Sequence, residues 1–174
     1  MTTVRDAVAD DAAAIAGIYN ANVVSTTVAW TDETESVEHR RAWLASQADA
    51  GNPVLVAVED RDGGTVIGFG SYGDFRDTAK WPGYRFTVEH TIHVADGHRG
   101  AVTGRALMLA LIDRAVADGY HRMVGGIDGD NAASIRFHER LGFAQVARLP
   151  EVGFKFGRWL DLVLVQLALD QPRP

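Results

Sequence analysis

Residues 88–107, VEHTIHVADGHRGAVTGRAL, constrain the fold of this chain more than any other segment. They begin with an apolar run typical of a strand, and after a turn a short loop at residues 99–104 leads directly into a helical pattern. A loop with little side-chain bulk that opens into a helix turns several backbone N–H groups toward one point, where the helix dipole favours a phosphate or pyrophosphate group. Because Glu89 lies on the preceding strand, the segment predicts an anion site beside a carboxylate.

The loop alone does not decide between this interpretation and a simple strand-to-helix connection that uses a glycine for tightness. Its spacing differs from that of two known phosphate loops, G-x-x-x-x-G-K-[ST] and G-x-G-x-x-G, and no acidic residue follows where a ribose would need one. The rest of the sequence has to supply the context.

Helical and strand patterns alternate along the chain. We expect strands at residues 3–5, 54–59, 65–72, 86–94, 121–127, 144–149 and 160–169, and helices at residues 10–23, 36–49, 104–118 and 132–141. Residues 62–64, Asp-Gly-Gly, predict a hairpin turn, and Gly119 and Gly142 are expected to end helices. The alternation predicts a single α/β (α+β) domain over residues 1–174, with its core at about residues 3–169 and helices flanking a mixed sheet in three layers.

Charge and composition exclude several classes of function. A net charge of −6 without a dense basic run argues against a nucleic-acid partner, and the absence of cysteine excludes thiol catalysis, disulfides and cysteine-bound zinc. His90 and His93 are three residues apart on a strand, so they point to opposite faces and no metal site is expected. The sequence shows no signal peptide and no apolar stretch of membrane-spanning length, which predicts a cytoplasmic protein without membrane contact.

A second segment, NAASIRFHERLGF at residues 131–143, supplies the missing context, because Asp130 or Asn131 can cap its helix. The order strand, R-x-x-x-x-G loop, helix, strand and N-A-x-S-x-x-x-H-E-x-x-G-F resembles the GNAT superfamily of acetyl-CoA-dependent N-acetyltransferases over residues 4–166. Residues 84–90 (YRFTVEH), 137–139 (FHE) and 152–161 (VGFKFGRWLD) together resemble its phosphinothricin and methionine sulfoximine acetyltransferase branch. The resemblance implies a twisted, mostly antiparallel sheet and a homodimer.

Two residues are the catalytic candidates. Glu89 is expected to take the proton that the acceptor amine must lose before it attacks, and the alternative is a strand carboxylate paired with Arg85 or a nearby histidine. His138 stands where many GNAT enzymes carry a tyrosine near the cofactor thiol, so it is a candidate proton donor to the leaving thiolate. The alternative for His138 is a half-buried histidine that binds a carbonyl.

The resemblance also implies two binding sets. Acetyl-CoA is expected to contact Thr91, Ile92, His93, Val94, Arg99, Gly100, Ala101, Val102, Thr103, Gly104, Arg105, Asn131 and Ser134. The acceptor is expected to contact Trp30, Phe75, Arg76, Asp77, Tyr84, Arg85 and Thr87, and the alternative is a solvated loop whose aromatic rings fold back onto the core. Val102 replaces an inner glycine of the family pattern. It weakens cofactor binding if that position needs a positive φ or a close approach of the phosphate, and it costs little if the φ there is ordinary.

The predicted function is transfer of an acetyl group from acetyl-CoA to the primary amine of a small amino-acid-like acceptor, of the phosphinothricin, methionine sulfoximine or methionine sulfone type. Transfer would be direct, within a ternary complex. Two alternatives stay open: a non-catalytic acyl-CoA-binding domain, and an acetyltransferase for another amine such as a peptide N-terminus. Lys155, Arg158 and Trp159 are expected near the pocket or a subunit interface, without a role in the chemistry.

Overall fold

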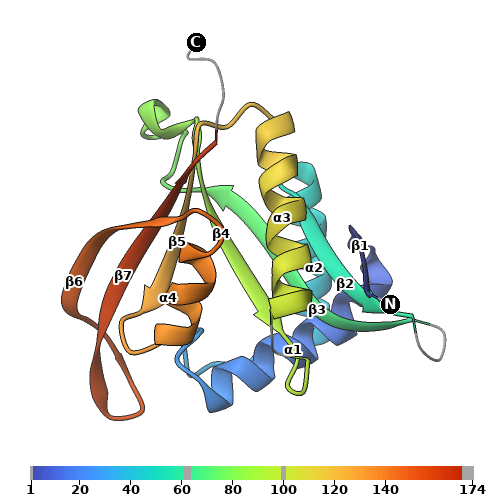
Figure 1. Ribbon diagram of the computed structural model, residues 1–174. Coiled ribbons are helices and arrows are strands. Elements are labelled where there is room, and N and C mark those ends of the chain that lie inside the picture. The colour runs from blue at the N-terminus through green and yellow to red at the C-terminus, as the bar shows by residue number, and fades with distance from the viewer. Residues whose placement is uncertain (1, 61–63, 99–100, 170–174) are drawn as a thin grey trace.

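The computed structural model describes residues 2–60, 64–98 and 101–169, and a seven-stranded sheet is central to these ranges (Figure 1). The strands are β1 (Thr2–Asp6), β2 (Val54–Glu59), β3 (Thr65–Asp74), β4 (Thr87–Val94), β5 (Arg122–Asp128), β6 (Ala144–Lys155) and β7 (Arg158–Ala168). The helices are α1 (Ala12–Ser25), α2 (Val37–Asp49), α3 (Ala101–Ala117) and α4 (Ala132–Glu139), with short 3-10 turns at Ala9–Asp11 and Pro82–Tyr84. None of the described helices is long and apolar enough to cross a membrane.

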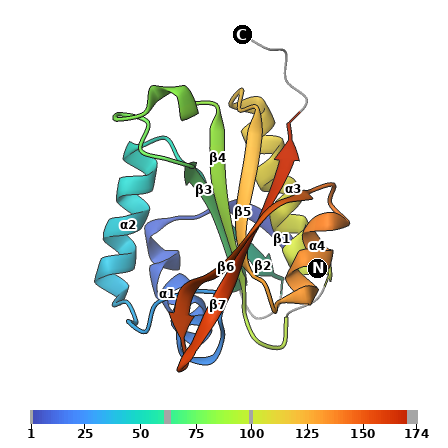
Figure 2. The same cartoon turned by 90° about the vertical axis from the view of Figure 1, so that its left-hand side faces the viewer.

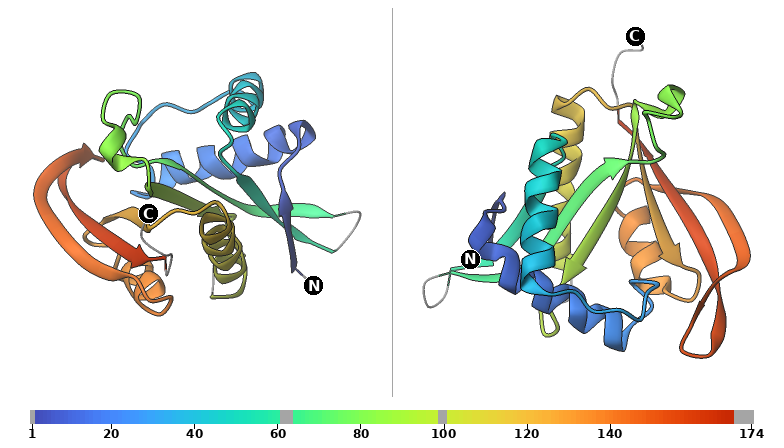
Figure 3. Two further views of the ribbon diagram at one scale, coloured as in Figure 1. Left: turned by 90° about the horizontal axis from the view of Figure 1, so that it is seen from above. Right: turned by 180° about the vertical axis from the view of Figure 1, so that it is seen from behind.

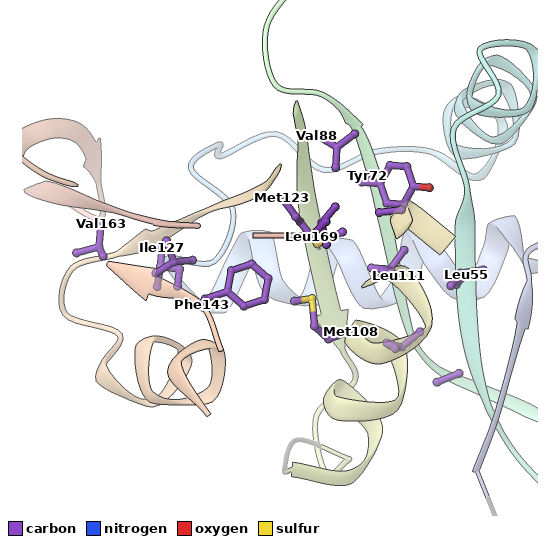
Figure 4. Close-up of a cluster of buried hydrophobic side chains, with 14 of the residues drawn as sticks. Leu55, Tyr72, Val88, Met108, Leu111, Met123, Ile127, Phe143, Val163 and Leu169 are labelled. Atoms are coloured by element: carbon purple, nitrogen blue, oxygen red, sulfur yellow. The ribbon is translucent and has the colours of Figure 1, made fainter. Parts of the chain in front are cut away.

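Helices cover both faces of the sheet, which accounts for the uninterrupted apolar run of β2 (Figures 2 and 3). On one face, Ile15 of α1 and Leu44 of α2 pack on Phe69. On the other face, Leu107, Met108 and Leu111 of α3 lie within a larger apolar cluster that includes Met123 and Val163 (Figure 4). The three-layer arrangement predicted from the sequence is therefore confirmed.

The strand order is β1-β2-β3-β4-β5-β7-β6, and all neighbours are antiparallel except β4 and β5. These two parallel strands pair at only three positions, of which Glu89 with Val124 is the last. Beyond that point β4 continues along β3 and β5 continues along β7. The two strands diverge there, so the sheet contains an opening in its middle (Figure 1).

Several predicted boundaries hold and others are wrong. Gly119 (φ +82°) and Gly142 (φ +92°) follow α3 and α4 in the left-handed conformation that ends helices. The helix predicted from Gly104 begins at Ala101, so residues 101–103 are helical and do not form a loop, and α4 ends at Glu139 and not at residue 141. The predicted turn at residues 62 and 63 lies outside the described residues.

The last hairpin is longer than predicted. The expected strand ended at residue 149, yet β6 continues through Pro150 to Lys155 and β7 already begins at Arg158. Proline is tolerated here because β6 is an edge strand and its pairing with β7 is irregular between Leu149 and Gly153. Glu151, with φ 53°, lies in this irregular stretch.

Candidate active site

The divergence of β4 and β5 opens a cleft of ≈ 630 Å³, which we call the β4–β5 cleft. Ile92, His93 and Val94 of β4 form one wall, and residues of α3 and α4 form the other. Three arginines lie along it, Arg105, Arg136 and Arg140, together with the apolar side chains of Phe137 and Leu141. Asn131 also lines the cleft and caps α4, because its Oδ1 accepts a hydrogen bond from the Ser134 N–H at 3.0 Å.

The chemistry of the cleft suits a long anionic molecule that carries amide groups. Beyond Glu89, the edge of β4 that faces β5 has no strand partner, so its N–H and C=O groups are available to amides. The arginines supply positive charge for phosphates, and Phe137 and Leu141 supply apolar surface.

A second cavity, of ≈ 500 Å³, lies on the opposite face of β4, and we call it the α2 cavity. Glu89 and Thr91 of β4 line it together with Ser71 of β3 and with Arg40 and Trp43 of α2. Burial raises the pKa of the half-buried Glu89 carboxyl, and the positive charge of Arg76 partly opposes this shift. A carboxylate with a raised pKa is a better proton acceptor, so Glu89 has the properties of a general base.

His93 lines both cavities. Its ring stacks on Phe69 with centroids 4.9 Å apart and meets the edge of Tyr19 at 5.5 Å. Burial lowers the pKa of His93 to about 4, so the imidazole is neutral at pH 7, and its buried Nδ1 has no hydrogen-bond partner. The two cavities therefore meet at one neutral side chain of β4.

Comparison with known proteins identifies the family. Residues 15–143 match the model of the Acetyltransferase (GNAT) family. The chain belongs to the GNAT acetyltransferase family. The predicted fold and enzyme class are thereby confirmed.

Named relatives narrow the comparison. This GNAT chain is 47% identical over 169 residues to the L-methionine sulfoximine/L-methionine sulfone acetyltransferase of Salmonella typhimurium, covering 97% of this chain and 95% of the relative. It is 36% identical to the phosphinothricin N-acetyltransferase of Alcaligenes faecalis, covering 97% and 83% of the two chains. The solved structure of yncA from Salmonella typhimurium with its cofactor acetyl-CoA superposes with a TM-score of 0.92 at 45% identity and covers 99% of this chain and 96% of its own.

Most of the predicted cofactor residues of the GNAT chain gather at the β4–β5 cleft. Those that line it are Ile92, His93, Val94, Gly104, Arg105, Asn131 and Ser134. Thr91 lines the α2 cavity instead, and Thr103 is buried and lies against Gly68 of β3. Arg99 and Gly100 lie outside the described residues, and Ala101 is the first residue of α3.

Val102 lies in the first turn of α3 with its side chain 74% exposed. Among the described residues, the non-glycine positions with positive φ are Glu151 and Phe156, so the backbone of Val102 is ordinary. The replacement of the family's inner glycine therefore strains nothing in this structure.

None of the predicted acceptor residues is among the described residues that line the α2 cavity. In the loop before β4, Phe75 and Tyr84 meet edge to face at 5.9 Å, Arg76 stacks on Phe75, and Arg85 stacks on Phe86. Asp77 accepts hydrogen bonds from two backbone N–H groups of its own loop, and Thr87 lies half-buried at the start of β4. Phe75 and Tyr84 thus contact each other while Tyr84 stays exposed, and Arg76 is close enough to act on Glu89. The acceptor contacts of this loop stay a prediction.

His138 is buried next to Phe137, one of the α4 residues that line the cleft. Its Nδ1 lies 2.7 Å from the Ser134 carbonyl oxygen, so Nδ1 carries the proton and donates it. The ring stacks on His90 at 5.1 Å, and burial lowers the pKa of His138. His90 and His93 lie on opposite faces of β4, as their spacing predicts.

Sequence reasoning missed an aromatic cluster around Arg40. The guanidinium carbon lies 4.4 Å from the ring centroid of Tyr19 and 4.6 Å from that of Trp43, and Nη2 is 2.6 Å from Oε2 of Glu35. All four residues line the α2 cavity. The sequence signal that could have revealed this cluster was the spacing of two residues. Arg40 and Leu44 are four residues apart, so Arg40 shares the apolar face of its helix.

Lys155 ties the loop after α1 to the last hairpin. The residue is 1% exposed, and its ammonium group donates hydrogen bonds to the carbonyl oxygens of Val23, Thr26 and Ala29, at 2.6, 2.9 and 2.6 Å. The same loop carries Trp30, whose six-membered ring packs on Gly153 so closely that a Cβ there would lie 2.3 Å from it. The predicted acceptor residue Trp30 is thus held against β6.

Proposed function

We propose that this acetyltransferase moves the acetyl group of acetyl-CoA to the α-amine of a small amino acid whose side chain ends in an oxygen-bearing group. Methionine sulfone, methionine sulfoximine and phosphinothricin are the expected acceptors. The observation that carries the proposal is the meeting of two cavities at β4, one with the features of a cofactor site and one that holds Glu89. The names of the relatives support the acceptor class.

The residues of the β4–β5 cleft fit acetyl-CoA. Arg105, Arg136 and Arg140 would hold its phosphates, and the unpaired edge of β4 would bind the amides of its pantetheine arm. When bound, the cofactor supplies an acetyl thioester. Asn131 and Ser134 line the same cleft at the start of α4.

Glu89 accepts the proton that the acceptor ammonium must lose, directly or through one water molecule. The chain has no cysteine, so an acetyl-cysteine intermediate is excluded and the amine attacks the thioester directly. Arg76, which already acts on Glu89, lies where it can pair with the α-carboxylate next to the amine. Most of the rate would come from holding amine and thioester together.

A thiol-release assay tests the proposal. Purified protein with acetyl-CoA is offered methionine sulfone, methionine sulfoximine, phosphinothricin, free lysine, an aminoglycoside and a short peptide with a free N-terminus. Free CoA is expected with the first three acceptors and much less with the others. Turnover confined to the peptide or the aminoglycoside would overturn the acceptor class, and cofactor binding without thiol release from any amine would favour a non-catalytic domain.

We further propose that the enzyme is a cytoplasmic homodimer whose subunits meet at the β6–β7 hairpin. Several large apolar side chains of this hairpin are exposed: Val146, Leu149, Val152, Phe154, Phe156 and Trp159. A group of exposed apolar side chains of this kind, in which Phe154 and Trp159 contact each other, supports a protein interface. Acetyl-CoA is an intracellular cosubstrate, which supports the cytoplasmic assignment.

A further inference from the structure

The α2 cavity has an unusual balance of charge for a site that would bind an amino acid. Its lining contains three carboxylates, Glu35, Asp74 and Glu89. Arg40 is the single arginine or lysine among the described residues that line it, because Arg76 and Arg85 lie outside. An oxygen-bearing tail of an acceptor inside this cavity therefore has Arg40 as its permanently charged donor in the lining, whereas Arg76, outside the lining, is assigned to the α-carboxylate.

The surroundings of Arg40 leave it with unused hydrogen-bonding capacity. The residue is 5% exposed, and its buried Nε has no hydrogen-bond partner among the residues that the structure describes. Burial lowers the pKa of Arg40 in spite of the opposing charge of Glu35, so one carboxylate does not fully compensate the buried cation. The aromatic rings of Tyr19, Trp43 and Phe69 exclude water from the guanidinium faces, which strengthens any hydrogen bond that it makes.

The register of the sheet shows which part of an acceptor can reach Arg40. The guanidinium carbon of Arg40 lies 5.9 Å from the ring centroid of Phe69, and Phe69 pairs with His93. Glu89 pairs with Gly73, four residues further along β3, which corresponds to about 13 Å of strand.

In extended methionine sulfone the amine nitrogen and a tail oxygen are about 6 Å apart. With one hydrogen bond of about 3 Å at the amine and another at the tail oxygen, the acceptor can join groups about 12 Å apart, which is close to the separation along the strand. The α-carboxylate shares a carbon with the amine and is too close to Glu89 to span the cavity.

We propose that Arg40 determines acceptor specificity by donating hydrogen bonds to the oxygen atoms at the end of the acceptor side chain. This inference rests on the proposed function, because it assumes that the amine lies at Glu89. The acceptor then lies along β4, with its polar tail in the aromatic cluster at Arg40. Side chains without oxygen at their tip lose this contact and bind more weakly.

The test compares acceptors that differ mainly in the tail. Arg40→Gln and Arg40→Lys are assayed with methionine sulfone, phosphinothricin and norleucine, which has an apolar tail of similar length. Losing hydrogen bonds to a charged group should raise KM for methionine sulfone about 10- to 100-fold in Arg40→Gln. The increase should be larger for phosphinothricin, whose tail is anionic, and less than about threefold for norleucine.

Arg40→Lys keeps the charge but loses the planar fork, so it should fall between the wild type and Arg40→Gln, and it carries the test if Arg40→Gln does not fold. Glu35→Gln is the matched control: it removes the partner of Arg40 while leaving the donor, and the preference for methionine sulfone over norleucine should persist. An equal loss for all three acceptors would show that Arg40 is purely structural and overturn the inference. If the wild type acetylates none of them, the proposed function itself fails, and this inference with it.

Discussion

His90 should make the stability of the protein fall steeply on mild acidification. The residue is buried between His138 and Phe143, with ring centroids 5.1 and 5.4 Å away, and within the described part of the chain neither of its ring nitrogens has a hydrogen-bond partner. Burial, reinforced by His138, lowers the pKa of His90 from 6.5 to about 3. Between these two pH values the unfolded chain binds a proton at His90, whereas the folded protein does not.

The sign and size of the effect follow from this difference. Because the folded pKa is the lower one, the stabilisation is complete above pH 6.5 and is lost as the pH falls toward 3. Each pH unit in this window corresponds to about 1.4 kcal/mol, so at pH 5 His90 alone should have removed about 2 kcal/mol.

The substitution His90→Leu removes the titrating group together with its two unpaired nitrogens. At pH 7.5 the variant should be at least as stable as the wild type, because an unpaired buried polar group is itself unfavourable. Between pH 7.5 and pH 5 it should lose about 2 kcal/mol less than the wild type. Urea unfolding followed by circular dichroism measures both quantities, and His39→Gln, at an exposed position, is the matched control. Parallel pH profiles for the wild type and His90→Leu would refute the reasoning.

Three other predictions follow from the site and the hairpin. Replacing Arg76 with Gln removes a cation that favours ionised Glu89, so the pKa of Glu89 should rise and the acid limb of the kcat/KM pH profile should move to higher pH. An unchanged acid limb would show that Arg76 does not act on Glu89. Lys155→Met leaves three carbonyl groups without their donor and should lower the free energy of unfolding by about 3–5 kcal/mol in urea titrations, whereas a loss below about 1 kcal/mol would contradict the assigned contacts. Trp159→Glu, next to the exposed ring of Phe154, should convert a dimer mass to a monomer mass in light scattering, and a wild-type monomer at all micromolar concentrations would contradict the dimer.

The sequence predicts well those features that depend on local chemistry. Gly119 and Gly142 end their helices because a left-handed residue is needed there, and Asn131 caps α4 through its own side chain. Features that depend on distant packing were missed. Thr103 is buried against β3, which is consistent with α3 beginning before Gly104, and Pro150 is accepted because β6 has no neighbour on its outer side.

The residues of the candidate site also divide into those placed by local sequence and those placed by distant packing. Glu89 and the residues of the β4–β5 cleft lie close together in the sequence or next to a capping motif, so their placement could be inferred. Arg40 and Trp43 reach the α2 cavity from a helix whose orientation is set by the apolar contact of Leu44 with the sheet. The aromatic residues near Phe75 contact one another outside the lining of the cavity, so their predicted contact with the acceptor stays a prediction.

The hydrogen bonds that Lys155 donates also constrain the order in which parts of the structure can form during synthesis. They join residues 132, 129 and 126 positions apart, and β7, the last of the described strands, lies between β5 and β6 in the sheet. A nascent chain from which β7 has not yet emerged lacks the hairpin that holds the loop after α1. Contacts of such long range form late and slowly, so the wall that carries Trp30 becomes ordered only after β7 has been synthesised. A truncated chain without β7 would therefore retain the sequence of its catalytic strand and lose the enclosure around it.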